Sequence, residues 1–170
     1  MNTAKCWMRT ETTPTRLWER AESKKDVYID VAYRLLYQTL CPSWLYEVEH
    51  GATTIWEFWD AIKADGKVGT CSFNHYAFGC VGDWMYRNIL GINNGDIAYR
   101  KITIQPDFSC GLTYASGSYE TVNGKVGVDW KIENGKKYVQ VDIPVNTTAT
   151  LKLAGKDDCE VGSGHYEFII

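Results

Sequence analysis

The stretch GINNGD, residues 91–96, divides the chain into two parts with different hydrophobic periods. Before it, apolar residues recur every three or four positions, which is the pattern of helices with one buried face. After it, apolar and polar residues alternate, which is the pattern of strands with one buried face. The sequence therefore predicts a helical domain over residues 1–95 and a β domain over residues 96–170, a multidomain chain of the α-then-β class.

The β part contains six segments with the composition and alternation of strands. Val126, Val128 and Trp130 alternate with polar residues, so one face of their strand is expected to be buried. The Asn-Gly pairs at residues 123–124 and 134–135 are typical of tight hairpin turns. We therefore expect an antiparallel β-sandwich. Its expected strands are residues 101–106, 111–122, 125–133, 136–145, 149–154 and 165–170.

The helical part is expected to contain three helices. So few helices cannot enclose a deep pocket by themselves, so we expect them to belong to a larger helical assembly of which this chain is a fragment. The first expected helix contains the apolar stripe Val27, Val31 and Leu35, with Tyr28, Ala32 and Leu36 beside it. The second runs from about Thr54 to Ile62, and the third runs from about Phe73 or Asn74 to Leu90 and is capped by Gly91.

The charge and hydropathy of the chain argue against two classes of partner. Its formal net charge is -3, and no block of basic residues is present, so we expect no nucleic-acid partner. No apolar run approaches the length of a transmembrane helix, and the N-terminal stretch lacks the apolar core of a signal peptide. We therefore expect no membrane partner.

The six cysteines are scattered, without a C-x-x-C pair and without histidines at zinc spacing. We expect no metal site and no cofactor. Because a chain of this size folds without a disulfide scaffold, reduced thiols and a cytoplasmic setting are favoured. Any signal peptide of a longer parent protein would lie outside this chain.

GATTIWEFWD, residues 51–60, holds the strongest candidate for chemistry. Glu57 stands between Trp56 and Trp59, and such aromatic rings either pack in a core or form stacking platforms for sugars. Thr54 and Glu57 have the spacing of a capping box, which satisfies backbone N–H groups at the start of a helix. Glu57 would alternatively serve as a general base. The local sequence leaves both interpretations open.

Two histidines flank Glu57 in the sequence. His75 is expected at the start of the third helix, where its ring would face the same opening as Glu57 and donate to a sugar hydroxyl. His50 directly precedes the GATTIWEFWD stretch, and His165 on the last strand is interpreted as structural. Neither a G-x-S-x-G nucleophile elbow nor a glycine-rich phosphate loop is present.

Several strings, occurring in a fixed order, resemble one known family over roughly residues 28–168. The chain is similar to the C-terminal part of bacterial α-L-rhamnosidases of glycoside hydrolase family 78. The stretch before residue 28 does not line up with that family. The strings are PSW at 42–44, EHGATTIWEFWDAI at 49–62, SFNHYAFGCVGDWMYRNILGI at 72–92, ITIQPD at 102–107, GLTYASGSYETVNGKV at 111–126 and VGSGHYEF at 161–168.

The resemblance implies an (α/α)6 barrel of six α-hairpins followed by a β-sandwich, of which this chain would hold the last barrel helices and the sandwich. Such enzymes hydrolyse terminal α-L-rhamnosyl groups with inversion and need no metal for the chemistry. Glu57, in the WE of ATTIWE, is then the general base. His75, in NHYAFG, then contacts rhamnose, and we include Trp56 and His50 among the expected substrate-binding residues.

Inverting hydrolysis also requires a second carboxyl group as general acid. In the family this acid lies in an earlier barrel segment, which is not recognised in this sequence. The expected partners are therefore an upstream segment of the same protein and a rhamnose-containing glycoside or polysaccharide, and the fragment alone is expected to be inactive. The alternatives are a non-catalytic carbohydrate-binding or structural module, and an inverting glycosidase that acts on a different sugar.

Overall fold

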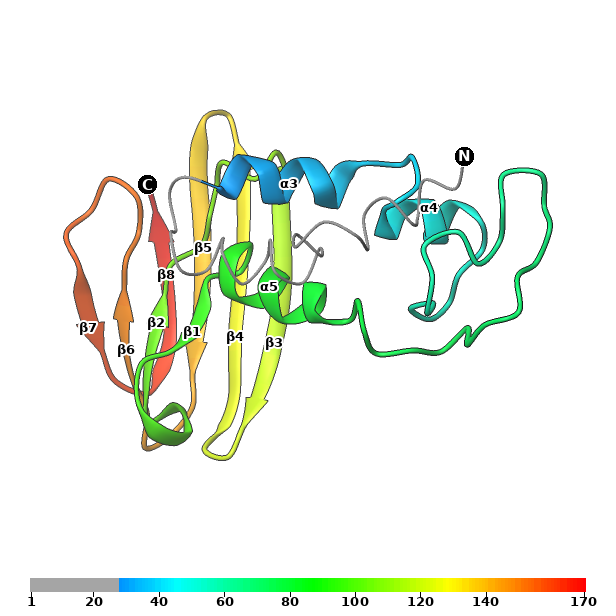
Figure 1. Ribbon diagram of the computed structural model, residues 1–170. Coiled ribbons are helices and arrows are strands. Elements are labelled where there is room, and N and C mark those ends of the chain that lie inside the picture. Colours follow the sequence, from blue (N-terminus) through cyan, green and yellow to red (C-terminus); the bar gives the residue numbers. More distant parts are fainter. Residues whose placement is uncertain (1–27) are drawn as a thin grey trace. The chain divides into compact units, whose positions relative to one another are not determined.

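The computed structural model describes residues 28–170 (Figure 1). They divide into two compact units between Gly82 and Asp83. We call residues 28–82 the helical unit and residues 83–170 the β unit. Val27, expected on the first helix, lies outside the described residues, as does the rest of the predicted first domain before residue 28. Compact units need not coincide with family domains, so the domain limits 1–95 and 96–170 remain a prediction.

The first expected helix is confirmed as α3, Ile29–Tyr37. Its buried side includes Ala32, Leu35 and Leu36, whereas Val31 is exposed. Leu35 of the expected stripe and the residues beside it, Ala32 and Leu36, are thus buried as predicted, and Val31 departs from the prediction.

The spacing of apolar residues does not predict α4, Trp44–Glu49. This helix has only six residues, too few to display a helical period. Its start is fixed by Ser43, whose side-chain Oγ accepts a hydrogen bond from the Tyr46 N–H at 3.0 Å. The helix buries Trp44, Tyr46 and Glu47.

The helix expected from Thr54 to Ile62 is wrong, because these residues form bends and turns. The Thr54 hydroxyl donates to the Phe73 carbonyl, and the Glu57 carboxylate accepts from the Ser72 N–H. Neither side chain caps a helix, so the capping-box interpretation is also wrong. Hydrogen bonds to a distant segment have replaced the local helical pattern.

The third expected helix is shorter at its start than the sequence predicts. It is α5, Cys80–Asn88, so His75 precedes it and does not lie in its first turn. The Gly79 N–H donates to the Tyr76 carbonyl at 2.8 Å, which is a turn before the helix begins. Gly91 has the left-handed backbone expected after a helix end, with φ of 75°.

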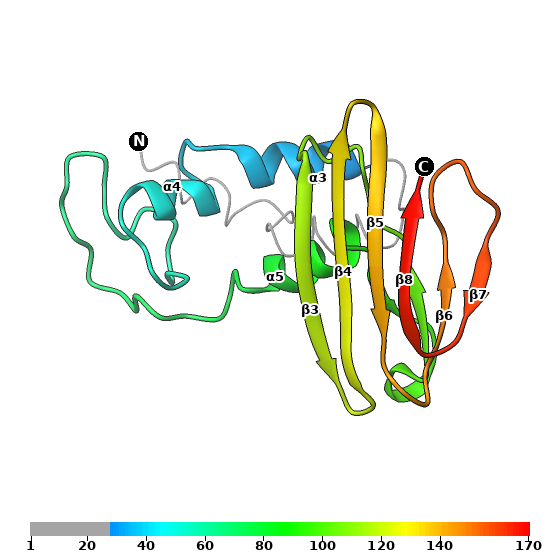
Figure 2. The ribbon, with the colours of Figure 1, turned by 180° about the vertical axis from the view of Figure 1, so that it is seen from behind.

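The β unit consists of two four-stranded sheets with the strand orders β1-β2-β6-β7 and β3-β4-β5-β8. Figures 1 and 2 show these sheets as two layers, in agreement with the expected sandwich. All six expected strands are present, and β1 and β7 are additional. The strands are β1 Ile92–Asn94, β2 Lys101–Ile104, β3 Tyr114–Thr121, β4 Gly124–Glu133, β5 Lys136–Ile143, β6 Thr148–Leu151, β7 Cys159–Val161 and β8 Gly164–Ile169, and the 3-10 helix η1, Ile97–Tyr99, joins β1 to β2.

One strand pair differs from the expected antiparallel arrangement. β2 and β6 run parallel, with Lys101 opposite Thr148 and Ile104 opposite Leu151. The strands β3, β4 and β5 lie between them in the sequence, so no hairpin imposes an antiparallel direction on this pair.

The expected alternation in β4 is confirmed. Val126, Val128 and Trp130 are buried, and Trp130 also donates its indole N–H to the Ile89 carbonyl at 2.9 Å. This bond ties β4 to the chain that follows α5. Every second side chain of β4 from Val126 to Trp130 therefore lies in the core of the β unit. The Trp130 bond attaches this core to Ile89, just after α5.

The two Asn-Gly pairs behave differently. Asn134 and Gly135 both have positive φ, 52° and 75°, as a two-residue hairpin turn of the expected type requires. In the other hairpin Thr121 pairs with Gly124, so its turn lies at residues 122–123, one residue earlier than predicted.

Candidate functional site

Two segments of the helical unit that are distant in sequence are joined by backbone hydrogen bonds. The Glu57 N–H donates to the Ser72 carbonyl at 2.9 Å, and the His75 N–H donates to the Ile55 carbonyl at 2.8 Å. The two candidates with the strongest sequence signal, Glu57 and His75, therefore lie on segments that run alongside each other.

These paired segments, residues 54–57 and 72–75, hold the Glu57 carboxylate in one orientation. Its Oε2 accepts a hydrogen bond from the Ser72 N–H at 2.8 Å, so the backbone and the side chain of Glu57 both bond to one residue. The Glu57 side chain is partly exposed and can reach water. An anchored carboxylate with access to water meets the geometric requirement of a general base.

The ring of His75 has a defined donor nitrogen. Its Nδ1 accepts from the Ala77 N–H at 3.2 Å, which assigns the proton of the neutral ring to Nε2. The ring stacks on Tyr76 with centroids 5.2 Å apart and planes within 9°. Tyr76 is 89% exposed, so this stacked pair lies at the surface of the helical unit. The Nε2–H can donate to a polar group of a ligand.

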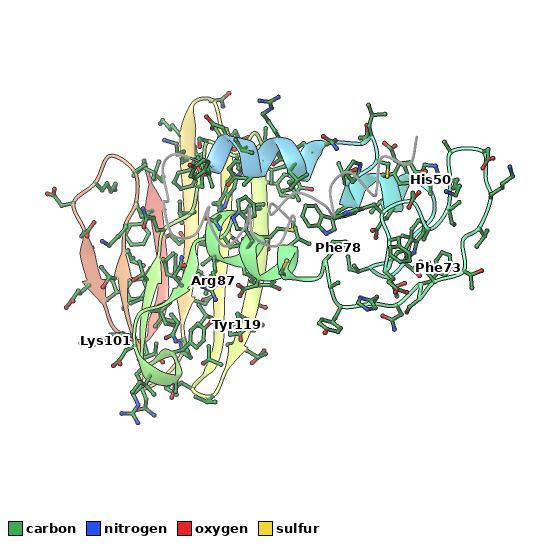
Figure 3. All side chains as sticks on the ribbon, viewed as in Figure 1. His50, Phe73, Phe78, Arg87, Lys101 and Tyr119 are labelled. Carbon is green, nitrogen blue, oxygen red and sulfur yellow. The ribbon has the colours of Figure 1, made fainter. Side chains whose placement is uncertain are left out.

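The two tryptophans that flank this carboxylate in sequence belong to the core. Trp56 is 3% exposed and meets the Phe73 ring edge-on, with centroids 5.3 Å apart. Trp59 meets Trp44 edge-on at 4.9 Å and stacks on Phe78 at 3.9 Å. Phe73 and Phe78 are labelled in Figure 3. These rings support the paired segments from the inside, as the core interpretation of the aromatic composition predicts.

Glu47 on α4 is a candidate that the sequence analysis misses. Its side chain is 1% exposed, and burial raises its pKa to about 7, opposed by a hydrogen bond from the Trp56 N–H. Oε2 accepts that bond at 3.2 Å, and Oε1 has no hydrogen-bond partner among the described residues. The only signal in the sequence is that Glu47 stands between the apolar residues Tyr46 and Val48. A helix of six residues is too short for its apolar spacing to show which face is buried.

Metal and membrane chemistry can be examined over the same part of the chain. Residues 28–170 contain no group of three or more His, Cys, Asp and Glu side chains arranged to hold a metal ion. No helix in that range has the length and apolarity needed to cross a bilayer. Burial raises the pKa of the Cys71 thiol, and the nearby charges of Glu57 and Asp60 raise it further, so this thiol is neutral beside the paired segments.

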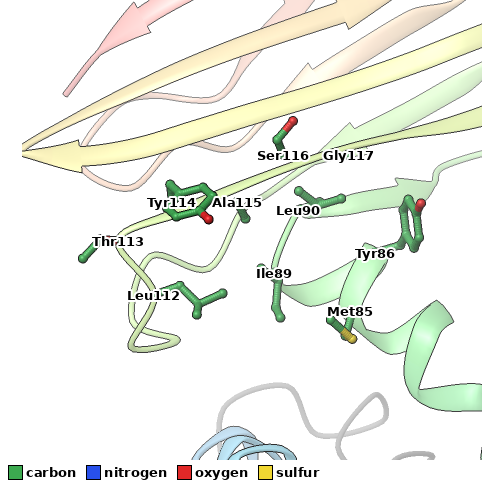
Figure 4. A pocket seen from close by; sticks show the side chains of 10 residues that line it. All are labelled: Met85, Tyr86, Ile89, Leu90, Leu112, Thr113, Tyr114, Ala115, Ser116 and Gly117. Atoms are coloured by element: carbon green, nitrogen blue, oxygen red, sulfur yellow. The ribbon is translucent and has the colours of Figure 1, made fainter. Parts of the chain in front are cut away.

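The β unit contains an apolar groove of about 500 Å³ (Figure 4). Met85, Tyr86, Ile89 and Leu90 from α5 and its exit line one side, and residues 112–117 line the other. The described residues that line it include no carboxyl group and no imidazole.

Comparison with known families identifies both units. The bacterial alpha-L-rhamnosidase 6 hairpin glycosidase domain matches residues 15–89, and the bacterial alpha-L-rhamnosidase C-terminal domain matches residues 91–168. The chain belongs to the bacterial α-L-rhamnosidases. The first match begins earlier than the limit near residue 28 that the sequence strings suggest.

Two curated relatives extend the family assignment. The α-L-rhamnosidase of Streptomyces avermitilis is 38% identical over 84% of this chain, and one of Formosa agariphila is 41% identical over 74%. These alignments cover 16% and 14% of the relatives, so this rhamnosidase chain spans less than a fifth of their length.

Solved α-L-rhamnosidases have the same fold over most of this chain. The Streptomyces avermitilis enzyme, crystallised with L-rhamnose, aligns over 86% of the chain with a TM-score of 0.79 and 37% identity. The native enzyme of Aspergillus terreus aligns over 89% with a TM-score of 0.82 and 34% identity. The chain covers 16% and 18% of these two structures.

The four residues expected to form the rhamnosidase site occupy different environments. Glu57 and His75 lie on the paired segments, whereas Trp56 is buried beneath them. His50 ends α4, where its Nδ1–H donates to the Tyr46 carbonyl at 2.8 Å and its ring stacks on the Tyr46 ring at 3.9 Å. His50 therefore has a structural task here. The catalytic and substrate-binding roles of all four residues remain predictions.

Proposed function

We propose that this chain supplies the general base of an inverting α-L-rhamnosidase and that Glu57 is the base. The observation that carries the proposal is the pairing of Glu57 with Ser72 and of His75 with Ile55, which sets a carboxylate and an imidazole on adjacent segments. Family membership supports the proposed reaction class, and this local geometry supports the choice of Glu57.

The proposed reaction assigns one task to each group. Glu57 takes a proton from water, and the resulting hydroxide attacks the anomeric carbon on the face opposite the leaving oxygen. Because Ser72 holds Oε2, the proton goes to Oε1. His75 donates its Nε2–H to a hydroxyl of the sugar and so orients the ring.

The general acid is proposed to come from an upstream segment of the same protein. An inverting enzyme keeps its two carboxyl groups roughly 6.5–9.5 Å apart, so that water fits between the base and the sugar. The helical unit would then be the last part of a six-hairpin barrel whose earlier helices carry the acid. The substrate class is a glycoside or polysaccharide with a terminal α-L-rhamnosyl group.

The test compares Glu57→Gln with the matched control Glu49→Gln in the full-length protein that contains this chain. Glu49 is an exposed carboxylate at the end of α4. Turnover of an aryl α-L-rhamnoside should fall roughly 10²–10⁴-fold for Glu57→Gln and stay unchanged for the control. Proton NMR should show β-L-rhamnose as the first product of the unmodified enzyme.

Two results would overturn this proposal. Near-normal turnover by Glu57→Gln would remove the base assignment. Detection of the native protein only at 19.3 kDa would leave no upstream acid in the same polypeptide.

A second candidate function is sugar binding by the outward face of the sheet β3-β4-β5-β8. Tyr114, Lys131 and Tyr138 align across three strands, with Lys131 Nζ 5.1 Å from the Tyr138 ring centroid. The next row includes Asp129 and Gln140, and both rows line a groove of about 620 Å³. Exposed aromatic rings beside hydrogen-bonding side chains suit a pyranose.

Binding of methyl α-L-rhamnoside to the full chain, followed by NMR, tests this second function. Tyr114 is 71% exposed, so Tyr114→Ala should abolish the shifts of its neighbours without unfolding the sheet. Val122→Ala, at an exposed hairpin tip, is the control and should leave them unchanged. Absence of shifts in the unmodified chain at millimolar sugar would reject the second function.

A further inference from the structure

A buried carboxyl group lies directly behind the proposed base. Of the Asp and Glu side chains in residues 28–170, that of Glu47 alone is buried. Burial without a compensating cation destabilises the charged form of a carboxyl group. Accordingly the pKa of Glu47 is raised to about 7, and the Trp56 N–H opposes this rise.

Glu47 fixes two points of the chain that leads to Glu57. Its main-chain carbonyl accepts from the Ala52 N–H at 3.0 Å, just after α4. Its side-chain Oε2 accepts from the Trp56 N–H at 3.2 Å, and Trp56 directly precedes Glu57. One residue therefore sets both ends of the turn that delivers the proposed base.

The two peptides that meet at Trp56 are held by different partners. The Trp56 N–H belongs to the Ile55–Trp56 peptide and donates to Glu47, whereas the Glu57 N–H belongs to the next peptide and donates to the Ser72 carbonyl at 2.9 Å. Loss of the Glu47 bond would let the first of these peptides shift, and the Glu57 carboxylate would move with it. A small misplacement of a catalytic group costs about 10²-fold in rate.

We propose that Glu47 is a positioning residue that holds the Ile55–Trp56 peptide, directly before Glu57, and thereby aims the Glu57 carboxylate at water and sugar. This inference rests on the proposed function of Glu57. A merely structural role would need only an uncharged group of similar shape, whereas Glu47 is ionisable and has one oxygen, Oε1, with no partner among the described residues. Uncompensated buried carboxyl groups are typical of functional sites.

The titratable surroundings of Glu47 are simple. Among residues 28–170, no cation contributes to its pKa. Its charge acts on the Cys41 thiol, whose pKa is raised to about 11 chiefly by burial, and then by Asp60 and Glu47. The thiol is therefore neutral throughout the range in which Glu47 titrates, so Cys41 adds no titration near neutral pH.

The kinetic experiment uses Glu47→Gln, Glu47→Leu and the control Glu49→Gln in the full-length protein. Leucine removes the acceptor for the Trp56 N–H, so kcat should fall about tenfold or more while KM stays within about threefold. Glutamine keeps the acceptor and cannot ionise, so kcat should be retained at pH 6. Any change of kcat with pH that the ionisation of Glu47 causes should have a midpoint near pH 7 and should disappear in this variant. Glu49→Gln should keep both the rate and the pH profile.

A second readout does not depend on activity. In the full chain labelled with ¹⁵N-tryptophan, the Trp56 amide should titrate with a midpoint near pH 7, and Glu47→Gln should abolish this titration. A Trp56 amide that does not titrate would overturn the inference. So would Glu47 variants that retain the pH profile of the unmodified enzyme, or a loss of kcat that only follows the folded fraction.

The two proposals fail in different ways. If Glu57→Gln is fully active, the proposed function fails and this inference fails with it. If Glu57→Gln is inactive while Glu47→Leu and Glu47→Gln match the unmodified enzyme in kcat and pH profile, only the positioning role of Glu47 is rejected.

Discussion

The β unit and the helical unit hold their backbones in different ways. In the β unit, consecutive residues of β3, β4 and β5 pair in an unbroken register, so each hydrogen bond is supported by its neighbours. In the helical unit, the paired segments depend on a few isolated bonds, such as those of Glu57 to Ser72 and of His75 to Ile55. The regular unit is a scaffold, and the irregular one carries the candidate chemistry, as is common for loops that present functional groups.

This difference predicts that the two units respond to different perturbations. The β unit should be most sensitive to a change in backbone geometry, because its register transmits strain from strand to strand. The helical unit should be most sensitive to a change in the charge of its interior, because Glu47 is buried where it bonds to the paired segments.

The largest expected effect is that of Gly91→Ala on the β unit. Gly91 has φ of 75°, and an added Cβ would lie 2.1 Å from the backbone carbon of Gln105. Left-handed strain and the backbone clash together should lower the free energy of unfolding by roughly 3–5 kcal/mol. Amide hydrogen exchange of β4 and β5 during urea unfolding would measure the loss.

Gly135→Ala is the matched control for this change. Gly135 has the same φ of 75°, but nothing lies within 4 Å of an added Cβ. Only the strain remains, about 1–2 kcal/mol. Equal losses at the two positions would show that close packing at Gly91 contributes nothing, and would weaken the contrast between the units.

The β unit is the part that sequence reasoning predicts well. In a strand with one buried face, apolar and polar residues alternate. The apolar residues Val126, Val128 and Trp130 therefore predict both the strand and its buried face. The parallel pairing of β2 with β6 could not be predicted, because the two strands are far apart in sequence and no turn connects them. The turn at residues 122–123 lies one residue before the predicted Asn123-Gly124 turn. Several types of tight turn favour the same residues, so the sequence does not fix the exact position.

The helical unit resists such prediction for a physical reason. Residues 54–62 have helical spacing and a helix-capping pair, yet Thr54 and Glu57 bond to a segment that follows them by fifteen residues or more. Propensity describes neighbours in sequence and is outweighed by such tertiary bonds. The sequence does not reveal Glu47 as a candidate for the same reason. Its burial and its bond to Trp56 arise only when α4 packs in the helical unit.

The second effect concerns the pH dependence of the helical unit. The pKa of Glu47 rises from 4.5 to about 7 on folding, so between these values the folded state binds more protons than the unfolded state. The contribution of neutral Glu47 to the free energy of unfolding is therefore complete below about pH 4.5. It is lost as pH rises towards 7, and the loss is roughly 3 kcal/mol in all. Urea unfolding of the full chain, followed by exchange of the His75 and Glu57 amides, would record this slope.

Glu47→Gln is the variant that isolates this slope. It keeps an acceptor for the Trp56 N–H and cannot ionise, so the unit should lose its dependence on pH between 4.5 and 7. If stability still falls with pH to the same extent in this variant, another group causes the fall. The buried charge of Glu47 would then not distinguish the helical unit from the β unit.

The smallest expected effect is at His165 on the surface of the β unit. Its Nδ1 lies 2.7 Å from Asp142 Oδ1 and its Nε2 lies 3.4 Å from Glu167 Oε1, and the first of these bonds is the main cause of a raised pKa. Protonated His165 thus stabilises the fold fully below its unfolded pKa near 6.5, and the contribution disappears as pH rises through the folded value. Because all three side chains are exposed, water and salt screen the pair.

NMR titration of the His165 ring separates the two carboxylates. Asp142→Asn should lower the ring pKa more than Glu167→Gln does, because the shorter bond holds the proton more strongly. His165→Gln should lower the stability of the β unit only where the ring is protonated, most below pH 6.5. This change should be smaller than the one that Glu47→Gln causes in the helical unit at pH 7. A response of His165→Gln as large as that of Glu47→Gln would show that the β unit too depends on charge, and that backbone register alone does not explain its stability.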